Sequence, residues 1–152
     1  MNLTRVDDTN ADPVLRMVPV YLREIAPDLA APTEDRIARF WQEKNRNAYL
    51  LGDPEAPDGF AMTRRITPRL MELCEFYIRP ECRGWGRGRS GAAAVISTRR
   101  GAWRLGIARD AQQAGEFWKS VLEAMPNVTG LKAGPPLTPF HKQSLTFIVT
   151  ER

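Results

Sequence analysis

The segment from Met71 to Ser97 constrains the fold more strongly than any other part of the sequence. Its first residues, MELCEFYI, alternate as a strand does, and the alanine-rich run over Ser90–Thr98 is typical of a helix. Between them lies a glycine-rich basic loop, RGWGRGR, at residues 83–89. Glycines let backbone N–H groups approach a ligand closely, and a helix that begins after the loop adds free N–H groups and partial positive charge. This pattern predicts a cradle for a pyrophosphate group, with Arg83, Arg87 and Arg89 at its rim.

Two common phosphate-binding motifs do not fit this loop. No Lys-Ser or Lys-Thr pair follows the glycines, so the loop is not of the Walker type. The glycine spacing also differs from GxGxxG, and no parallel strand is expected downstream, so the segment is not a Rossmann dinucleotide site. The predicted cradle therefore belongs to neither of these fold families.

Strands and helices are expected on both sides of this segment. Strands are predicted at Asn2–Val6, Asn47–Leu51, Gly59–Ile66, Leu70–Ile78, Ala102–Ala108 and Ser144–Thr150, with an optional strand before the last one. Helices are predicted to begin at Asp12-Pro13 with Asp12 as N-cap, at Thr33, at Ser90, and after Asp110 as a cap.

This order of elements predicts an α/β (α+β) fold. It has three layers, with a central, mostly antiparallel, twisted sheet flanked by helices. Turns at Gly52-Asp53-Pro54 and Thr67-Pro68 predict that the three middle strands form an antiparallel meander. The length of 152 residues fits a single domain over residues 1–152.

Composition excludes several classes of protein. The chain is 43% hydrophobic and 26% charged, which is typical of a globular protein and not of a disordered one. It holds two cysteines and one histidine, too few for a structural zinc site, so no metal is expected. The N-terminus does not resemble a secretory signal, and no apolar run approaches the roughly 20 residues that span a bilayer. We expect a cytoplasmic protein without a membrane partner.

The charge balance suggests an anionic partner. Lysine and arginine number 22 against 18 acidic residues, which gives a net charge of +4. The abundance of arginine reflects either phosphate recognition or the codon bias of a genome. RGWGRGR could also be a nucleic-acid patch with an interleaved aromatic side chain. Such patches are usually repeated and disordered, whereas this loop is single and short, so a nucleic-acid partner is not expected.

The spacing Arg83-x-x-Gly86-x-Gly88, set between a strand and a helix, resembles the acetyl-coenzyme A (acetyl-CoA) motif of the GNAT superfamily of N-acetyltransferases. In that superfamily the motif reads Gln/Arg-x-x-Gly-x-Gly/Ala. The predicted order of elements is also the GNAT order, so the resemblance covers nearly the whole chain. The segment AGEFWKSVLEAM resembles the fourth helix of such enzymes. In finer detail, EFYI, the loop, GAWRLGI and FWKSV are similar to a group of small predicted bacterial acetyltransferases.

The resemblance implies a role for each part of this motif. Phe76, Tyr77 and Ile78 would lie along the pantetheine arm of acetyl-CoA, and a backbone N–H near Ile78 would polarise the thioester carbonyl. The loop residues would hold the pyrophosphate: Arg83, Gly84, Trp85, Gly86, Arg87, Gly88 and Arg89. Trp85 would cover the adenine or the pantetheine, or else be an exposed residue or a dimer contact, since the resemblance makes a homodimer plausible.

Two glutamates on the strand before the loop are candidates for the catalytic base. The strand Trp103–Ile107 would splay from Met71–Ile78 and open a slot where the acetyl group meets an amine. A protonated amine must lose a proton before it attacks, and a carboxylate often accepts it. Strict alternation places Glu72 and Glu75 on opposite faces, which a bulge would change. We favour Glu75, which precedes the aromatic pair.

Both glutamates could instead have a structural role and no part in catalysis. Either of them could be a solvated strand residue or an ion-pair partner of Arg64, Arg65 or Arg69.

One departure from the family pattern bears on activity. Many GNAT enzymes protonate the leaving thiolate with a tyrosine on the fourth helix, but the matching position here is Trp118, and Ala111 replaces the usual asparagine. Trp118 would either line the cofactor site or pack in the core. The leading hypothesis is acetyl transfer from acetyl-CoA to a primary amine of an unidentified small molecule or peptide. The alternative is a weak or inactive acyl-CoA-binding module of the same fold.

Weaker signals concern the acceptor side. The acidic residues Glu24, Asp28, Glu34 and Asp35 would border the acceptor site of a GNAT enzyme and suit a cationic amine. The single histidine, His141, lies in a proline-rich segment that is expected to be a loop, so a solvated or anchoring role is expected for it more than a catalytic one.

Overall fold

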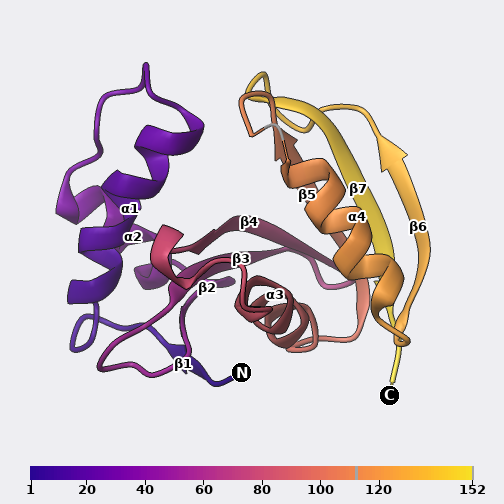
Figure 1. Ribbon diagram of the computed structural model, residues 1–152, viewed down its shortest axis with the longest axis horizontal. Coiled ribbons are helices and arrows are strands. Elements are labelled where there is room, and N and C mark those ends of the chain that lie inside the picture. Colours follow the sequence, from indigo (N-terminus) through magenta and orange to yellow (C-terminus); the bar gives the residue numbers. More distant parts are fainter. Residues whose placement is uncertain (112, 152) are drawn as a thin grey trace.

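A seven-stranded sheet with the strand order β1-β2-β3-β4-β5-β7-β6 is the centre of the fold in the computed structural model, which describes residues 1–111 and 113–151 (Figure 1). In chain order the elements are β1 (Leu3–Arg5), α1 (Asp12–Ile25), α2 (Glu34–Gln42), β2 (Arg46–Leu51), β3 (Gly59–Thr67), β4 (Leu70–Ile78), a 3-10 turn η1 (Pro80–Cys82), α3 (Arg87–Ile96), β5 (Gly101–Ala108), α4 (Ala114–Ala124), β6 (Val128–Gly134) and β7 (His141–Val149). Within the described sheet, β4 and β5 pair in parallel and all other neighbours pair antiparallel, which confirms the predicted, mostly antiparallel sheet and its meander. The expectation that no parallel strand follows the glycine-rich loop is wrong, because the chain crosses through α3 and β5 then runs in the same direction as β4.

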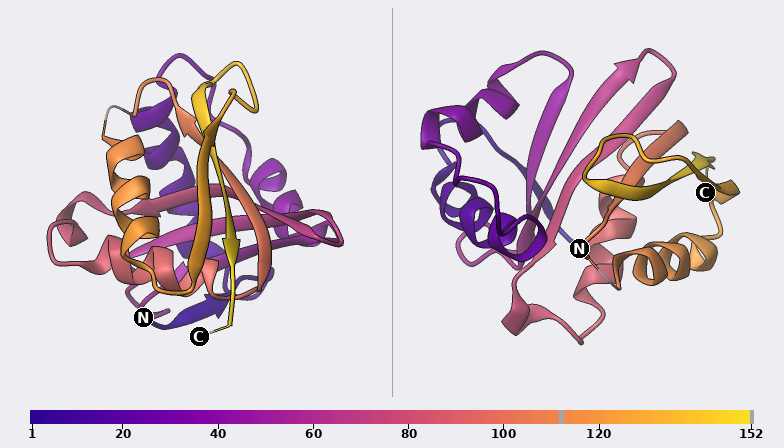
Figure 2. Two further views of the ribbon diagram at one scale, coloured as in Figure 1. Left: turned by 90° about the vertical axis from the view of Figure 1, so that its right-hand side faces the viewer. Right: turned by 90° about the horizontal axis from the view of Figure 1, so that it is seen from above.

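The sheet has a hydrophobic core on each face, and a pair of helices covers each core. Helices α1 and α2 pack on one face of β2, β3 and β4, around Val14, Ile37 and Phe60. Helices α3 and α4 pack on the other face, where Ile96 and Trp103 are fully buried. Figure 2 shows the sheet between these two pairs of helices and confirms the predicted three layers.

The first two helices begin close to where their sequences predict. Thr33 caps α2, because its hydroxyl accepts a hydrogen bond from the Arg36 amide at 3.3 Å. The prediction for α1 is off by one position: Asp12 is the first helical residue, Ala11 occupies the cap, and no side chain caps this end. Pro13 nevertheless lies in the first turn, where a missing N–H costs nothing.

Strands β4 and β5 run side by side and then separate, as the resemblance implied. They pair only from Leu70 to Leu73 on β4 and from Ala102 to Leu105 on β5. The separation starts beside a bulge in β4, because Met62 of β3 pairs with Glu75 while Thr63 pairs with Leu73. The extra residue, Cys74, therefore has no partner in this register, and a bulge of this kind bends and twists its strand.

Two helix starts differ from the sequence prediction. Helix α3 begins at Arg87, because Gly86 takes a left-handed conformation and caps the helix. Arg87, Gly88 and Arg89 therefore form the first turn of α3, so the predicted loop at residues 83–89 ends in a helix. Helix α4 begins at Ala114 with Gln113 at the cap, so Asp110 does not cap it.

The last strands also extend further than predicted. Strand β7 begins at His141, which places this residue at the start of a strand and not in a loop. The optional strand is β6, which pairs antiparallel with β7. No helix in residues 1–111 and 113–151 is long and apolar enough to cross a membrane.

Candidate active site

Two adjoining cavities lie where β4 and β5 separate. The larger one has a volume of about 460 Å³ and extends from the glycine-rich loop to α1 and α4. The smaller one has a volume of about 130 Å³ and reaches between β4 and β5 to Glu75 and Gly106. The two cavities are neighbours, because six side chains line both of them: Tyr21, Ile25, Phe76, Ala111, Ala114 and Trp118.

The outer end of the larger cavity is a stretch of backbone with free donors. Gly84 and Gly86 have φ angles of +87° and +76°, a conformation that L side chains rarely adopt. Within the described chain, none of the backbone N–H groups of residues 84–89 donates to a protein acceptor, and no side chain caps α3. This stretch therefore offers several N–H groups and a helix N-terminus to an anion, as the sequence predicts.

Gly88 allows close packing between α3 and α4 beside the cavity. A Cβ atom at this position would lie 3.2 Å from Cε1 of Phe117 on α4, which is tighter than nearly all real contacts. The absence of a side chain therefore lets α3 and α4 approach each other beside the loop.

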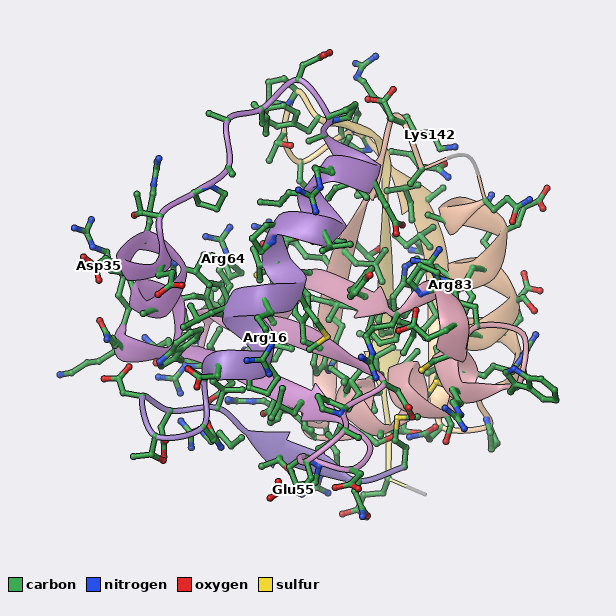
Figure 3. The ribbon with its side chains drawn as sticks, turned by 60° about the vertical axis from the view of Figure 1, so that its left-hand side comes forward. Arg16, Asp35, Glu55, Arg64, Arg83 and Lys142 are labelled. Carbon is green, nitrogen blue, oxygen red and sulfur yellow. The ribbon has the colours of Figure 1, made fainter. Side chains whose placement is uncertain are left out.

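The three loop arginines have different partners. Arg83 donates from Nε to the Ile78 carbonyl at 2.8 Å and from Nη2 to Glu24 of α1 at 2.9 Å. Arg87 pairs with Asp58 at 3.0 Å. Figure 3 shows Arg83 between α1 and α4, where it ties the loop to α1. Glu24 is thus already neutralised, which weakens the expectation of a free acidic patch for a cationic acceptor.

Arg89 is the loop arginine without an acidic partner in the described chain. Its guanidinium donates to the hydroxyl of Ser120 at 2.6 Å and lines the larger cavity. Because Ser120 carries no charge, the positive charge of Arg89 remains available to an anion. Trp85 is 78% exposed and does not line the larger cavity.

The end of β4 presents backbone and side-chain groups to the larger cavity. The Arg79 amide donates to the Asp58 carbonyl at 2.8 Å. Because hydrogen-bonding direction alternates along an antiparallel strand, the preceding residue, Ile78, has its N–H and carbonyl pointing away from β3. The Ile78 carbonyl is indeed the acceptor for Arg83. Phe76, Tyr77 and Ile78 all line the cavity wall, which is the wall where the resemblance expects the pantetheine arm.

Glu75 lies in the wall of the smaller cavity and has one hydrogen-bond donor in the described chain. Its carboxylate accepts from the hydroxyl of Tyr21 on α1. Burial raises the pKa of Glu75 to about 7, a rise that the Tyr21 hydrogen bond opposes and the nearby charge of Glu72 increases. A carboxyl group with a pKa near neutrality can take up and release a proton under physiological conditions.

Glu72 has opposite surroundings. It is 8% exposed and pairs through one oxygen with Arg64 at 3.0 Å and through the other with Arg104 at 2.7 Å. Neither cavity is lined by it. The pair with Arg64 is the structural alternative that the sequence left open for this residue.

The bulge corrects one detail of the sequence analysis. Strict alternation predicted Glu72 and Glu75 on opposite faces of the sheet. Inserting Cys74 shifts the alternation, so Glu75 faces α1 and contacts Tyr21, on the face that also carries Glu72 and Cys74. Beyond the bulge, Phe76 and Ile78 take the face that Met71 and Leu73 occupy before it.

Aromatic side chains of α4 and β4 pack together at the wall of the two cavities. Trp118 is 7% exposed, and its ring meets Phe76 edge-on with centroids 5.1 Å apart. It contacts Phe117 in the same way at 5.2 Å. Trp118 therefore packs in the core and lines both cavities, so the two expectations for this residue are compatible.

Tyr21 is a residue of the site that the sequence did not reveal. It lies on the apolar stripe of α1, which predicts only a core position. The one signal in the sequence is a phenolic hydroxyl on a buried stripe, because such a group usually finds a hydrogen-bond partner. Its partner lies 54 residues away, so the sequence could not name it.

His141 lies beside the smaller cavity. Its ring covers Gly106 of β5 so closely that a Cβ atom there would lie 2.1 Å from it. Burial lowers the pKa of His141, which favours the neutral ring. In residues 1–111 and 113–151, no three His, Cys, Asp or Glu side chains are grouped so that they could hold a metal ion.

This arrangement of sheet, diverging strands and loop is the fold of the GNAT-family acetyltransferases. Similar solved structures include an acetyltransferase of the GNAT family from Staphylococcus aureus, with a TM-score of 0.66, 11% identity, and coverage of 95% of this chain and 96% of the other. No protein-family model matches the sequence, and a search of curated proteins finds no significant match.

Two further similar structures contain coenzyme A. An aminoglycoside 6'-N-acetyltransferase complexed with coenzyme A has a TM-score of 0.69 and 13% identity, with coverage of 100% and 99% of the two chains. A spermidine N-acetyltransferase from Vibrio cholerae, in complex with CoA and spermine, has a TM-score of 0.66 and 11% identity, with coverage of 98% and 95%. Identities this low establish the fold, while the activity must be argued from the cavities and their side chains.

Proposed function

We propose that this protein is an N-acetyltransferase that moves an acetyl group from acetyl-CoA to a primary amine by direct attack. The observation that carries the proposal is the pair of adjoining cavities, with unpaired backbone N–H groups and Arg89 at one end and Glu75 at the other. A volume of about 460 Å³ for the larger cavity is within the usual range of ligand sites.

The residues at the outer end fit the phosphates of acetyl-CoA. The N–H groups of residues 84–89 would donate to the pyrophosphate, and Arg89 would add its unpaired charge. Phe76, Ile78 and Phe117 would enclose the pantetheine arm. When bound, acetyl-CoA supplies an activated acetyl group as a thioester.

Glu75 would remove a proton from the amine at the inner end. An alkyl amine with a pKa of about 10.4 is mostly protonated at neutral pH, so it needs a base before it can attack. Glu75, with a pKa of about 7, is partly ionised at that pH and lies in the wall of the smaller cavity. Glu72 would act indirectly, because its charge raises the pKa of Glu75 while its own oxygens stay paired with arginines.

Calorimetric titration with acetyl-CoA, coenzyme A and adenosine tests the binding half of the proposal. We expect the first two to bind and a Gly88→Val variant to bind both much more weakly, because its side chain would push against Phe117. Ala94→Val is the matched control, since Ala94 lies on the same helix but lines neither cavity. Failure of the folded wild-type protein to bind either CoA compound would overturn the proposal.

Release of free thiol in the presence of polyamines, aminoglycosides, amino acids and peptides tests the catalytic half.

The second candidate function is a CoA-binding module with weak or no turnover, which Trp118 favours because its indole is no proton donor for a thiolate. Tight binding of acetyl-CoA without thiol release to any amine would support that candidate.

A further inference from the structure

The described walls of the two cavities share six side chains, and one of them can release a proton. Five are Ile25, Phe76, Ala111, Ala114 and Trp118, which are hydrocarbon or indole groups. The sixth is Tyr21, whose hydroxyl donates to Glu75. The junction of the cavities is where a thioester held in the larger one would meet an amine held in the smaller one, so Tyr21 would place a hydroxyl beside the reacting atoms.

We propose that Tyr21 is the general acid of the acetyl transfer, and that its hydroxyl protonates the departing thiolate of coenzyme A while Glu75 returns a proton to it. This inference rests on the proposed function and adds a residue to it. Tyr21 comes from α1, at the opposite side of the cavity from Trp118 of α4, so the hydroxyl is supplied by a different element from the one where a tyrosine was expected.

The transfer balances with these two side chains. A protonated amine first loses its extra proton to solvent through Glu75. The nitrogen of the neutral amine then forms a bond to the acetyl carbon, and Glu75 takes the second proton that this nitrogen loses. The carbon–sulfur bond then breaks, and the sulfur leaves with the electron pair. Tyr21 gives its hydroxyl proton to the sulfur and receives the proton held by Glu75. Both side chains thereby return to their starting states, and the products are an amide and a free thiol.

Ring packing holds the Tyr21 hydroxyl in place. Its ring meets Phe60 of β3 edge-on, with centroids 5.4 Å apart, and Tyr77 of β4 at 5.6 Å. A ring held between two others has little freedom to turn away, so the hydroxyl stays directed at Glu75.

The charges around Tyr21 keep it protonated between turnovers. From β4 it faces Glu75 and the thiol of Cys74, and burial together with the charge of Glu75 raises the pKa of Tyr21 well above its ordinary value. Burial likewise raises the pKa of Cys74, so that thiol stays neutral. On α1 itself, Glu24 is paired with Arg83. A phenol this weakly acidic needs its proton replaced during the transfer, and Glu75 is the group in contact with it that can do so.

Tyr21→Phe is the direct test, because it removes one hydroxyl and keeps the packed ring. We expect kcat with acetyl-CoA to fall by about 10²-fold or more, the usual contribution of a general acid. Transfer from 4-nitrophenyl acetate should fall much less, because 4-nitrophenolate leaves without a proton. Tyr49→Phe is the matched control: Tyr49 lies on β2 and lines neither cavity, so both rates should stay at wild-type values.

A second readout needs no turnover. The thiol of coenzyme A bound to the protein can be titrated by the ultraviolet absorbance of its thiolate. A donor beside the sulfur stabilises the thiolate, so Tyr21→Phe should raise the pKa of the bound thiol and Tyr49→Phe should leave it unchanged. If Tyr21→Phe does not fold, wild-type protein containing fluorotyrosine, a more acidic phenol of nearly equal size, should lower that pKa.

The outcomes separate this proposal from the one on which it rests. If Tyr21→Phe lowered the rate equally with both acetyl donors, or left the pKa of the bound thiol unchanged, the role of Tyr21 would be overturned. The proposal of an acetyltransferase would still stand. A wild-type protein that binds no coenzyme A at all would overturn both.

Discussion

Glu72 and Glu75 lie three residues apart on β4 and face the same side of the sheet, but their partners differ. Glu72 has an arginine on each oxygen, whereas Glu75 has a neutral phenol. A carboxylate whose two oxygens both accept hydrogen bonds from arginines is held in place and is not free to contact an amine. A carboxylate that has lost solvent without gaining a cation holds its proton until near neutral pH. One carboxyl group is therefore structural and the other is poised for proton transfer.

Removing the charge of Glu75 should have the largest effect. We expect Glu75→Gln to lower kcat for acetyl transfer by about 10²-fold or more, because glutamine cannot accept the proton of the amine. In the wild-type protein the rate should rise with pH through about 7, where Glu75 loses its proton. Initial rates of thiol release across this range test both points.

Wild-type rates in Glu75→Gln would remove the assignment of Glu75 as the base. A rate that stays flat with pH while coenzyme A binding is intact would do the same.

Removing the charge of Glu72 should act mainly on stability. Glu72→Gln would leave Arg64 and Arg104 without their counter-charge, and both arginines are only partly exposed, so the free energy of unfolding should fall by about 1–3 kcal/mol. Glu43→Gln is the control, since it breaks an exposed pair with Arg46 and should cost less than about 1 kcal/mol.

Urea denaturation at neutral pH measures both values for this pair of variants. If Glu72→Gln proved no more costly than the exposed control, the two-arginine cluster would not stabilise the fold.

Glu75→Gln should shift stability in the opposite direction. The pKa of Glu75 is about 7 in the folded protein, above its usual value of 4.5, so this group supports folding fully below pH 4.5 and loses that support as the pH rises toward 7. Glutamine does not ionise. The variant should therefore be more stable than wild type above pH 7, by about 1–3 kcal/mol, with the difference disappearing below pH 4.5.

Denaturation curves at several pH values would show this crossover. A variant that is less stable than wild type at every pH would contradict the raised pKa of Glu75.

The loop arginines show the same contrast between paired and unpaired charges, and we expect substitutions there to have a smaller effect, on the affinity for coenzyme A. Arg89→Gln should weaken binding of coenzyme A by about tenfold, because it removes a charge that no acidic group in the described chain neutralises. Arg87→Gln should weaken binding less, since Arg87 is paired with Asp58. Arg100 pairs with Glu151 on the surface, so Arg100→Gln is the control for the change in net charge. Calorimetric titration gives all three affinities, and equal losses would contradict the distinction.

The parts of this molecule that depend on local pattern were predictable from the sequence. The alternation of MELCEFYI, the glycines after it and the alanine-rich run predicted strand β4, the loop and helix α3, and Thr33 predicted the start of α2. The start of α3 was three residues late, because a glycine at the cap permits a helix to begin within the basic run.

The parts that depend on contacts distant in sequence were not predictable. The bulge at Cys74 is set by the register with Met62 and Thr63 of β3, and it decides which way Glu75 faces. The partner of Glu75 lies on α1, and the partners of Arg83 and Arg87 lie 59 and 29 residues away. Alternation and charge show which residues are candidates, whereas only the fold shows which of them keep an unpaired charge.

The most direct test of the contrast between the two glutamates is the pKa of Glu75, which needs no acceptor amine. Protein labelled with carbon-13 at the glutamate carboxyl carbons can be titrated by NMR, with Glu75→Gln to assign the signal. We predict one glutamate signal that titrates near pH 7 and is missing from the variant. If every glutamate titrates at ordinary acidic values, Glu75 is not a poised base, and the catalytic part of this account is wrong.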